Sequence, residues 1–191
     1  SAHQAGDLDT AIRSYRQYLE LKPSSVEARS NLGAALARQG DYQTAITEYE
    51  AALRDSPGNP GVQLNIALAY YKMGDIRRAS AELNALRAAS GGNPQTTMLL
   101  ADCYLQLGDN KKVIDVLKPL NDAATPDLAV VYLLGTALIR DGQYTAGQVL
   151  LDRILRNGDS AEARLLMGTS KLGIADFAGA ASSLRHVARS S

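Results

Sequence analysis

Glycines recur along this chain at a fixed spacing of 34 residues, and this period constrains the fold more than any other feature. The recurring glycines are Gly6, Gly40, Gly74, Gly108 and Gly142. Aspartate follows the first four, and a sixth copy reads Ala175-Asp176 after a spacing of 33. A glycine at a helix end adopts the left-handed conformation without steric cost, and an aspartate behind it accepts hydrogen bonds from the next helix. The period therefore predicts an array of helical hairpins, each with a tight turn at the glycine.

Apolar residues keep the same register. A larger apolar residue and a small one precede each turn, as Leu32-Gly33, Ile66-Ala67, Leu100-Ala101, Leu134-Gly135 and Met167-Gly168. Nine residues after each turn comes Tyr15, Tyr49, Leu83, Leu117 or Leu151, and Leu184 in the last copy. Small residues at fixed places allow two helices to approach closely, and the larger residues fill the seam between them. Three helix starts are marked by an N-cap residue before proline: Asn59-Pro60, Asn93-Pro94 and Thr125-Pro126.

The pattern resembles the tetratricopeptide repeat over essentially the whole chain. The copy that matches best spans residues 26–59 and carries Leu32, Gly33, Gly40, Ala45, Tyr49, Ala52 and Pro57. The tryptophan of the family's first helix is replaced by Arg29, Gln63, Thr97, Val131 and Arg164. The resemblance implies an all-α fold, a right-handed α-solenoid of about six helix-turn-helix hairpins. We expect a single array over residues 1–191, with units at approximately 1–25, 26–59, 60–93, 94–127, 128–160 and 161–191.

The first of these units is incomplete, and the chain ends without a polar cap helix after the sixth. Solenoids usually need polar caps for solubility. We therefore expect a fragment, or missing flanking segments.

Composition argues against several classes of function. Lys plus Arg and Asp plus Glu both total 20, so the basic excess that phosphate contacts require is missing and no nucleic acid is expected as a partner. Cys103 is the only cysteine, and His3 and His186 stand far apart without metal-ligand spacing. The sequence predicts no catalytic residues, no metal and no cofactor, and hence no enzyme.

Three features of the first helices could line a ligand groove, because the resemblance implies that these helices form the concave side. Asn31 and Asn65 occupy equivalent places and could clamp a peptide backbone; they could equally be solvated polar residues. Arg38, Lys72 and Arg140 are equivalent too, and could form a basic rim. The simpler interpretation of these cations is that they complement the helix dipole.

The third feature is an apolar stripe. Its predicted members are Leu64, Leu68, Tyr71, Met98, Leu105, Tyr132, Ile139, Leu165 and Leu172. The other faces of these helices are already apolar, and a helix that is apolar nearly all round must be covered on all sides. The stripe could bind a partner, mediate self-association, or be absorbed by packing between neighbouring helices.

The sequence favours a protein–protein interaction scaffold that binds a peptide or an amphipathic helix in the concave groove. Two alternatives stay open: a docking arm of a larger enzyme, and a structural element of an envelope or secretion assembly. No targeting or transmembrane segment stands out, so the compartment, cytoplasmic or periplasmic, is left open and direct membrane insertion is not expected. The arginine and alanine content favours a bacterial source.

Overall fold

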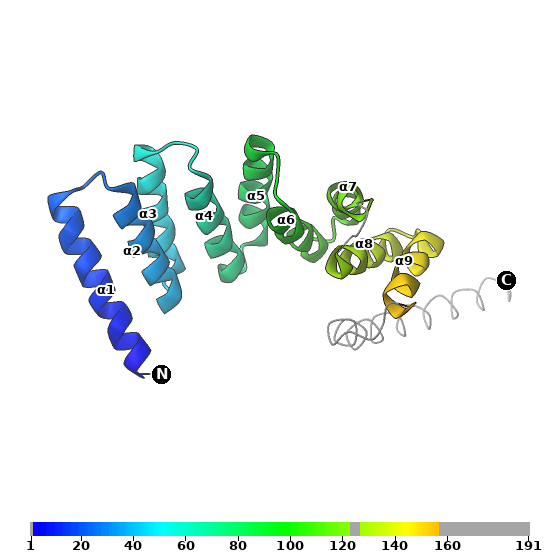
Figure 1. Ribbon diagram of the computed structural model, residues 1–191, viewed down its shortest axis with the longest axis horizontal. Coiled ribbons are helices and arrows are strands. Elements are labelled where there is room, and N and C mark those ends of the chain that lie inside the picture. Colours follow the sequence, from blue (N-terminus) through cyan, green and yellow to red (C-terminus); the bar gives the residue numbers. More distant parts are fainter. Residues whose placement is uncertain (1, 123–126, 157–191) are drawn as a thin grey trace, which may run out of the picture. The chain divides into compact units, whose positions relative to one another are not determined.

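The computed structural model describes residues 2–122 and 127–156 of the chain, and in these residues every regular element is an α-helix (Figure 1). The helices are α1 (Ala2–Leu21), α2 (Val26–Gln39), α3 (Tyr42–Asp55), α4 (Pro60–Met73), α5 (Ile76–Ser90), α6 (Pro94–Gln106), α7 (Asn110–Asn121), α8 (Leu128–Arg140) and α9 (Tyr144–Arg156). The chain divides into two compact units, Ser1–Val116 and Leu117–Ser191. The all-α array of hairpins is confirmed. The predicted unit at 161–191, with Leu165 and Leu172, lies outside the described residues.

The predicted turns form at four of the glycines. The φ angle is +91° at Gly40, +81° at Gly74, +77° at Gly108 and +85° at Gly142. At the first of them, the amide of Gly40 donates to the carbonyl of Ala37 and the amide of Asp41 donates to that of Leu36, both at 3.0 Å. The same two bonds recur at the other three turns. They satisfy the last carbonyls of each first helix, so one geometry closes all four hairpins.

Side-chain caps start the next helices. Asp41 accepts from the amide of Thr44 and Asp75 from that of Arg78, each at 3.1 Å. Asn59 and Asn93 cap α4 and α6, with proline at the first helical position as predicted. The prediction of a cap at Thr125 was wrong, because α8 begins at Leu128 and its cap is Asp127. Aspartate caps a helix better than threonine does, and it stands two residues further on.

The first copy departs from the repeat. Helix α1 runs unbroken from Ala2 to Leu21, so Gly6 and Asp7 are helical and do not form the expected turn. A glycine inside a helix costs only about 1 kcal/mol relative to alanine, so the helix can continue through Gly6.

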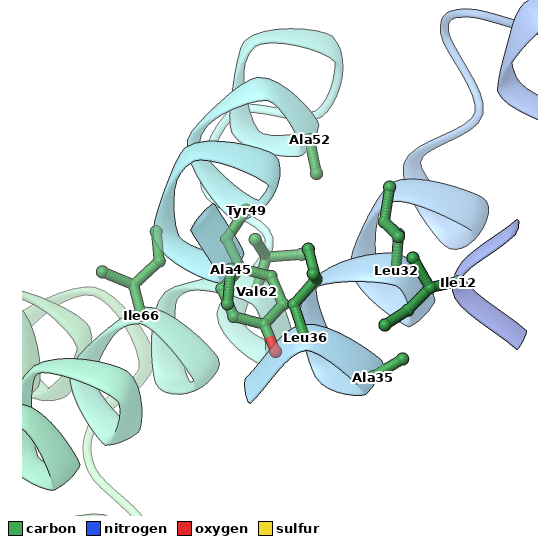
Figure 2. Packing of buried hydrophobic residues seen from close by; sticks show 9 residues of the cluster. All are labelled: Ile12, Leu32, Ala35, Leu36, Ala45, Tyr49, Ala52, Val62 and Ile66. Carbon is green, nitrogen blue, oxygen red and sulfur yellow. The ribbon is translucent and has the colours of Figure 1, made fainter. Parts of the chain in front are cut away.

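Burial in the first unit follows the register of the repeat. Tyr49 and Leu83 are 2% and 0% exposed, because the first helix of the same hairpin covers each of them. The equivalent Tyr15 on α1 is only half-buried. Between α1 and α4 the core is a cluster of nine buried residues, which Figure 2 shows: Ile12, Leu32, Ala35, Leu36, Ala45, Tyr49, Ala52, Val62 and Ile66.

The close approach of paired helices depends on small residues. A Cβ atom at Gly33 would lie 2.6 Å from Cε1 of Tyr49, far inside van der Waals contact. The second unit repeats the arrangement, since a Cβ at Gly135 would lie 3.0 Å from Cδ2 of Leu151. A Cβ at Gly147 would lie 2.6 Å from Cγ1 of Ile139. Almost no space therefore remains between the backbone of one helix and the facing side chain of the other, both in the α2–α3 hairpin and in the α8–α9 hairpin.

The turn glycines give a stability prediction. A Cβ at Gly74 meets nothing within 4 Å, so the cost of Gly74→Val comes from its φ of +81° alone. We expect a loss of about 1–2 kcal/mol in the free energy of unfolding, measured by urea denaturation. Gly61→Ala is the matched control, because Gly61 is helical without positive φ and should be neutral or stabilising by about 0.4–1 kcal/mol. Equal midpoints for Gly74→Val and the unmodified protein would contradict the left-handed turn.

Candidate functional site: a groove between the first helices

A groove of about 630 Å³ lies between the first turns of α2 and α4. Its lining residues come from both helices and from the loop before α4: Val26, Glu27, Ser30, Ser56, Asn59, Gly61, Val62, Leu64 and Asn65. Glu27 is the only charged residue among them. The groove thus combines apolar side chains with hydroxyl and amide groups, which is the character of many binding clefts.

Two side-chain caps start the helices that line this groove. The hydroxyl oxygen of Ser25 accepts from the amide of Ala28 at 3.3 Å, which starts α2. The side-chain oxygen of Asn59 accepts from the amides of Gly61 and Val62 at 3.1 and 3.2 Å, which starts α4. Because Asn59 also lines the groove, the same side chain that sets the start of α4 shapes the cleft.

The structure separates the two predicted amides. Asn65 is half-buried and lines the groove, whereas Asn31 is exposed and is not among the lining residues. The two positions are equivalent in the repeat, but only Asn65 lines the groove. At this groove Asn65 alone could hold a peptide backbone, and the two-residue clamp of Asn31 with Asn65 stays a prediction.

Except for Leu68, which is exposed, the part of the apolar stripe that lies in the first unit is half-buried. Leu64 lines the groove, and Leu68 is 37% exposed on the same helix. Met98 and Leu105 on α6 are half-buried. In the second unit Tyr132 and Ile139 are also half-buried, and both pack against the cluster of Val131, Leu151 and Ile154. Packing within the α8–α9 hairpin thus absorbs part of the stripe there.

Tyr71 has a polar role that its place in the stripe did not reveal. Its hydroxyl donates to Oδ2 of Asp102 at 2.6 Å. Nε2 of Gln106 donates to the same oxygen at 2.7 Å and to the hydroxyl of Tyr71 at 3.1 Å. The hydrogen bond to Asp102, followed by desolvation, raises the pKa of Tyr71 above its ordinary value. The sequence signal for this triad was available, because Asp102 interrupts an otherwise apolar face.

The predicted basic rim consists of exposed residues. Arg38, Lys72 and Arg140 lie in the last turns of α2, α4 and α8. That position complements the negative end of the helix dipole. No residue of the groove lining contributes a cation, so a role of these three in binding stays a prediction.

Arg29 stands where the tetratricopeptide repeat has a tryptophan in its first helix. It makes several polar contacts that the sequence did not predict. Its Nε and Nη2 donate to the carbonyl of Pro23 at 3.0 and 2.8 Å. Nη1 pairs with Glu48 at 3.2 Å, and Asp55 lies 3.9 Å from Nε. One guanidinium thereby ties the loop before α2 to α3, using its planar set of donors.

The described residues include one buried cysteine and no cluster of metal ligands. They contain no group of three or more His, Cys, Asp or Glu side chains that could hold a metal ion. Cys103 is buried, and desolvation raises its pKa to about 11. Nor does any helix of residues 2–122 and 127–156 have the length and apolar character to cross a membrane.

Comparison with known proteins identifies the family. Residues 1–60 and residues 36–95 match two models of the tetratricopeptide repeat. This chain is a tetratricopeptide repeat protein. Beyond the matched segment, the 34-residue register continues through the turns at Gly108 and Gly142, so the repeats extend along the described chain.

Solved structures of other tetratricopeptide repeat proteins share the fold. A crystal structure of MamA superposes with a TM-score of 0.71 at 19% identity, covering 81% of this chain and 90% of that one. MamA from Desulfovibrio magneticus RS-1 gives 0.70 at 21% identity, covering 82% and 90%. YrrB, a tetratricopeptide repeat protein with an unusual peptide-binding site, gives 0.73 at 15% identity, covering 88% and 86%. No curated protein sequence matches significantly.

The environment of Cys103 predicts an unreactive thiol. At pH 7.5 a pKa of about 11 leaves far less thiolate than an ordinary cysteine has, and only the thiolate is nucleophilic. We expect alkylation by iodoacetamide, followed by intact-mass spectrometry, to be roughly 100- to 1,000-fold slower than that of a free cysteine. In urea the modification should become rapid. Fast modification of the native protein would show that the thiol is neither buried nor raised in pKa.

Proposed function

We propose that this tetratricopeptide repeat protein is a non-enzymatic scaffold that binds a peptide segment of a partner protein in the groove between α2 and α4. The observation that carries the proposal is the groove itself, whose lining includes apolar, amide and hydroxyl side chains from two successive hairpins. A peptide presents apolar side chains together with backbone donors and acceptors, so its chemistry matches this lining.

The edges of the groove support the same function. Leu68 is 37% exposed one helical turn beyond Leu64, so apolar surface continues along α4 past the cleft. Exposed apolar surface next to a polar-lined cleft is typical of interaction sites. The peptide-binding site of YrrB, a protein of similar fold, adds to the expectation that such surfaces hold peptides.

The chemistry of the side chains favours binding over catalysis. The Cys103 thiol stays protonated at neutral pH. The raised pKa of Tyr71 likewise keeps its hydroxyl protonated and donating, so neither group is an activated nucleophile.

The matched pair Asn65→Ala and Asn31→Ala tests the groove. Peptides would be selected on the immobilised full chain from a displayed library of random sequences, and their affinities measured by fluorescence anisotropy. Asn65→Ala should weaken binding about 2- to 12-fold, because one hydrogen bond in the groove contributes roughly 0.5–1.5 kcal/mol. Asn31→Ala should leave the affinity unchanged, since Asn31 lies outside the groove lining.

Circular dichroism melting checks that both variants remain folded, and sedimentation velocity shows whether the chain self-associates through this surface. Selected peptides that bind Asn65→Ala as tightly as the unmodified protein would contradict peptide binding at this groove. So would a library that yields no binder at all.

A further inference from the structure

Asp102 lies in a hydrogen-bonded network that contains no cation among the described residues. Both hydrogen bonds that it accepts come from neutral groups, the hydroxyl of Tyr71 and the amide of Gln106, and both end on Oδ2. None of the ion pairs among the described residues includes Asp102. The other carboxylate oxygen, Oδ1, accepts none of the hydrogen bonds found there. The network therefore fixes the carboxylate in place and leaves one oxygen and the full charge for another group.

In the repeat register Asp102 corresponds to Ala34, Leu68 and Thr136, so the carboxylate is particular to this copy, and the residue one turn after it differs as well. The residue at the end of the first helix, in register with Gln106, is Arg38 in α2, Lys72 in α4 and Arg140 in α8. A cation in that place on α6 would stand four residues from Asp102 and could pair with it along the helix. Instead, an amide stands there, which orients the carboxylate but does not neutralise it.

The surroundings of Asp102 make an incoming cation favourable. Asp102 is half-buried, and so are Met98 and Leu105, which share its helix. A charge partly shielded from water interacts more strongly with an opposite charge than a fully solvated one does. Asp102 is the only charged residue of α6, and Glu27 is the only charged residue that lines the groove. Both charges are negative, so charge complementarity at these two places favours a positively charged group.

We propose that Asp102, held by Tyr71 and Gln106, binds a lysine or arginine side chain of the peptide, with apolar residues flanking that cation. The inference rests on the proposed function and specifies the chemistry of its partner. Apolar neighbours of the cation would contact the half-buried Met98 and Leu105 and the exposed Leu68. The ammonium or guanidinium group would donate to the free oxygen of Asp102 in a charge-assisted hydrogen bond.

The test compares peptides selected from one random display library on four full-length proteins: unmodified, Asp102→Asn, Gln106→Lys and Asp115→Asn. Asp115 is exposed on α7, so Asp115→Asn is the control that makes the same charge change elsewhere. Gln106→Lys keeps Asp102 but supplies the cation that the other copies have. Thermal melting by circular dichroism confirms that each variant is folded before selection.

On the unmodified protein and on Asp115→Asn, we expect selected peptides enriched in a single Lys or Arg among apolar residues. On Asp102→Asn and on Gln106→Lys this enrichment should disappear. For a basic peptide selected on the unmodified protein, either change should weaken binding roughly 12- to 150-fold, as expected for a hydrogen bond to a charged group. Raising the salt concentration should weaken binding to the unmodified protein more than binding to Asp102→Asn.

The outcomes separate the two proposals. Peptides that bind at the groove without basic enrichment, or with the same enrichment on Asp102→Asn, would overturn the role of Asp102 and leave the scaffold function standing. If Gln106→Lys binds basic peptides as well as the unmodified protein does, the open charge is not what recognises them. Failure to select any peptide on the unmodified protein would instead contradict the proposed function, and the inference with it.

Discussion

Close contact between a small residue on the first helix of a hairpin and a large side chain on the second is the constraint on which the rest of this structure depends. Gly33 lies against the ring of Tyr49, and Gly135 against Leu151. With no Cβ on one side, the two backbones come close enough for the facing side chain to fill the whole seam. The burial of Ala45, Leu83 and Leu117, each 0% exposed, follows from that spacing.

The same turn geometry repeats this contact from one hairpin to the next along the chain. The four left-handed glycines end their helices with the same pair of backbone hydrogen bonds, so the direction in which the chain leaves each first helix is the same. Helix α1 runs through Gly6 and Asp7, although the dipeptide is identical to Gly40-Asp41. The Gly-Asp dipeptide by itself therefore does not fix the turn.

The proposed binding features lie where the repeat is not obeyed. The outer residues of the first helices differ from copy to copy. Asn65 lines the groove while its equivalent Asn31 does not, and Gln106 stands where three other copies have a cation. Exposed places carry little packing cost, so they can change without loss of the fold. That freedom lets one fold carry a cleft of mixed polar and apolar lining on α2 and α4 and the Tyr71–Asp102–Gln106 network on α4 and α6.

The sequence by itself determined the fold class, the four glycine turns and the seam, because a strict period repeats each requirement of packing and turn geometry. It did not determine the continuous α1, the cap at Asp127 or the clamp of Arg29, since each depends on which groups are near in space. The apolar stripe predicted Tyr71 as an anchor, yet only the packing of α4 beside α6 brought its hydroxyl to Asp102, 31 residues away. Periodicity reports which face of a helix a residue occupies; only the tertiary structure decides which side chain of the neighbouring helix it meets.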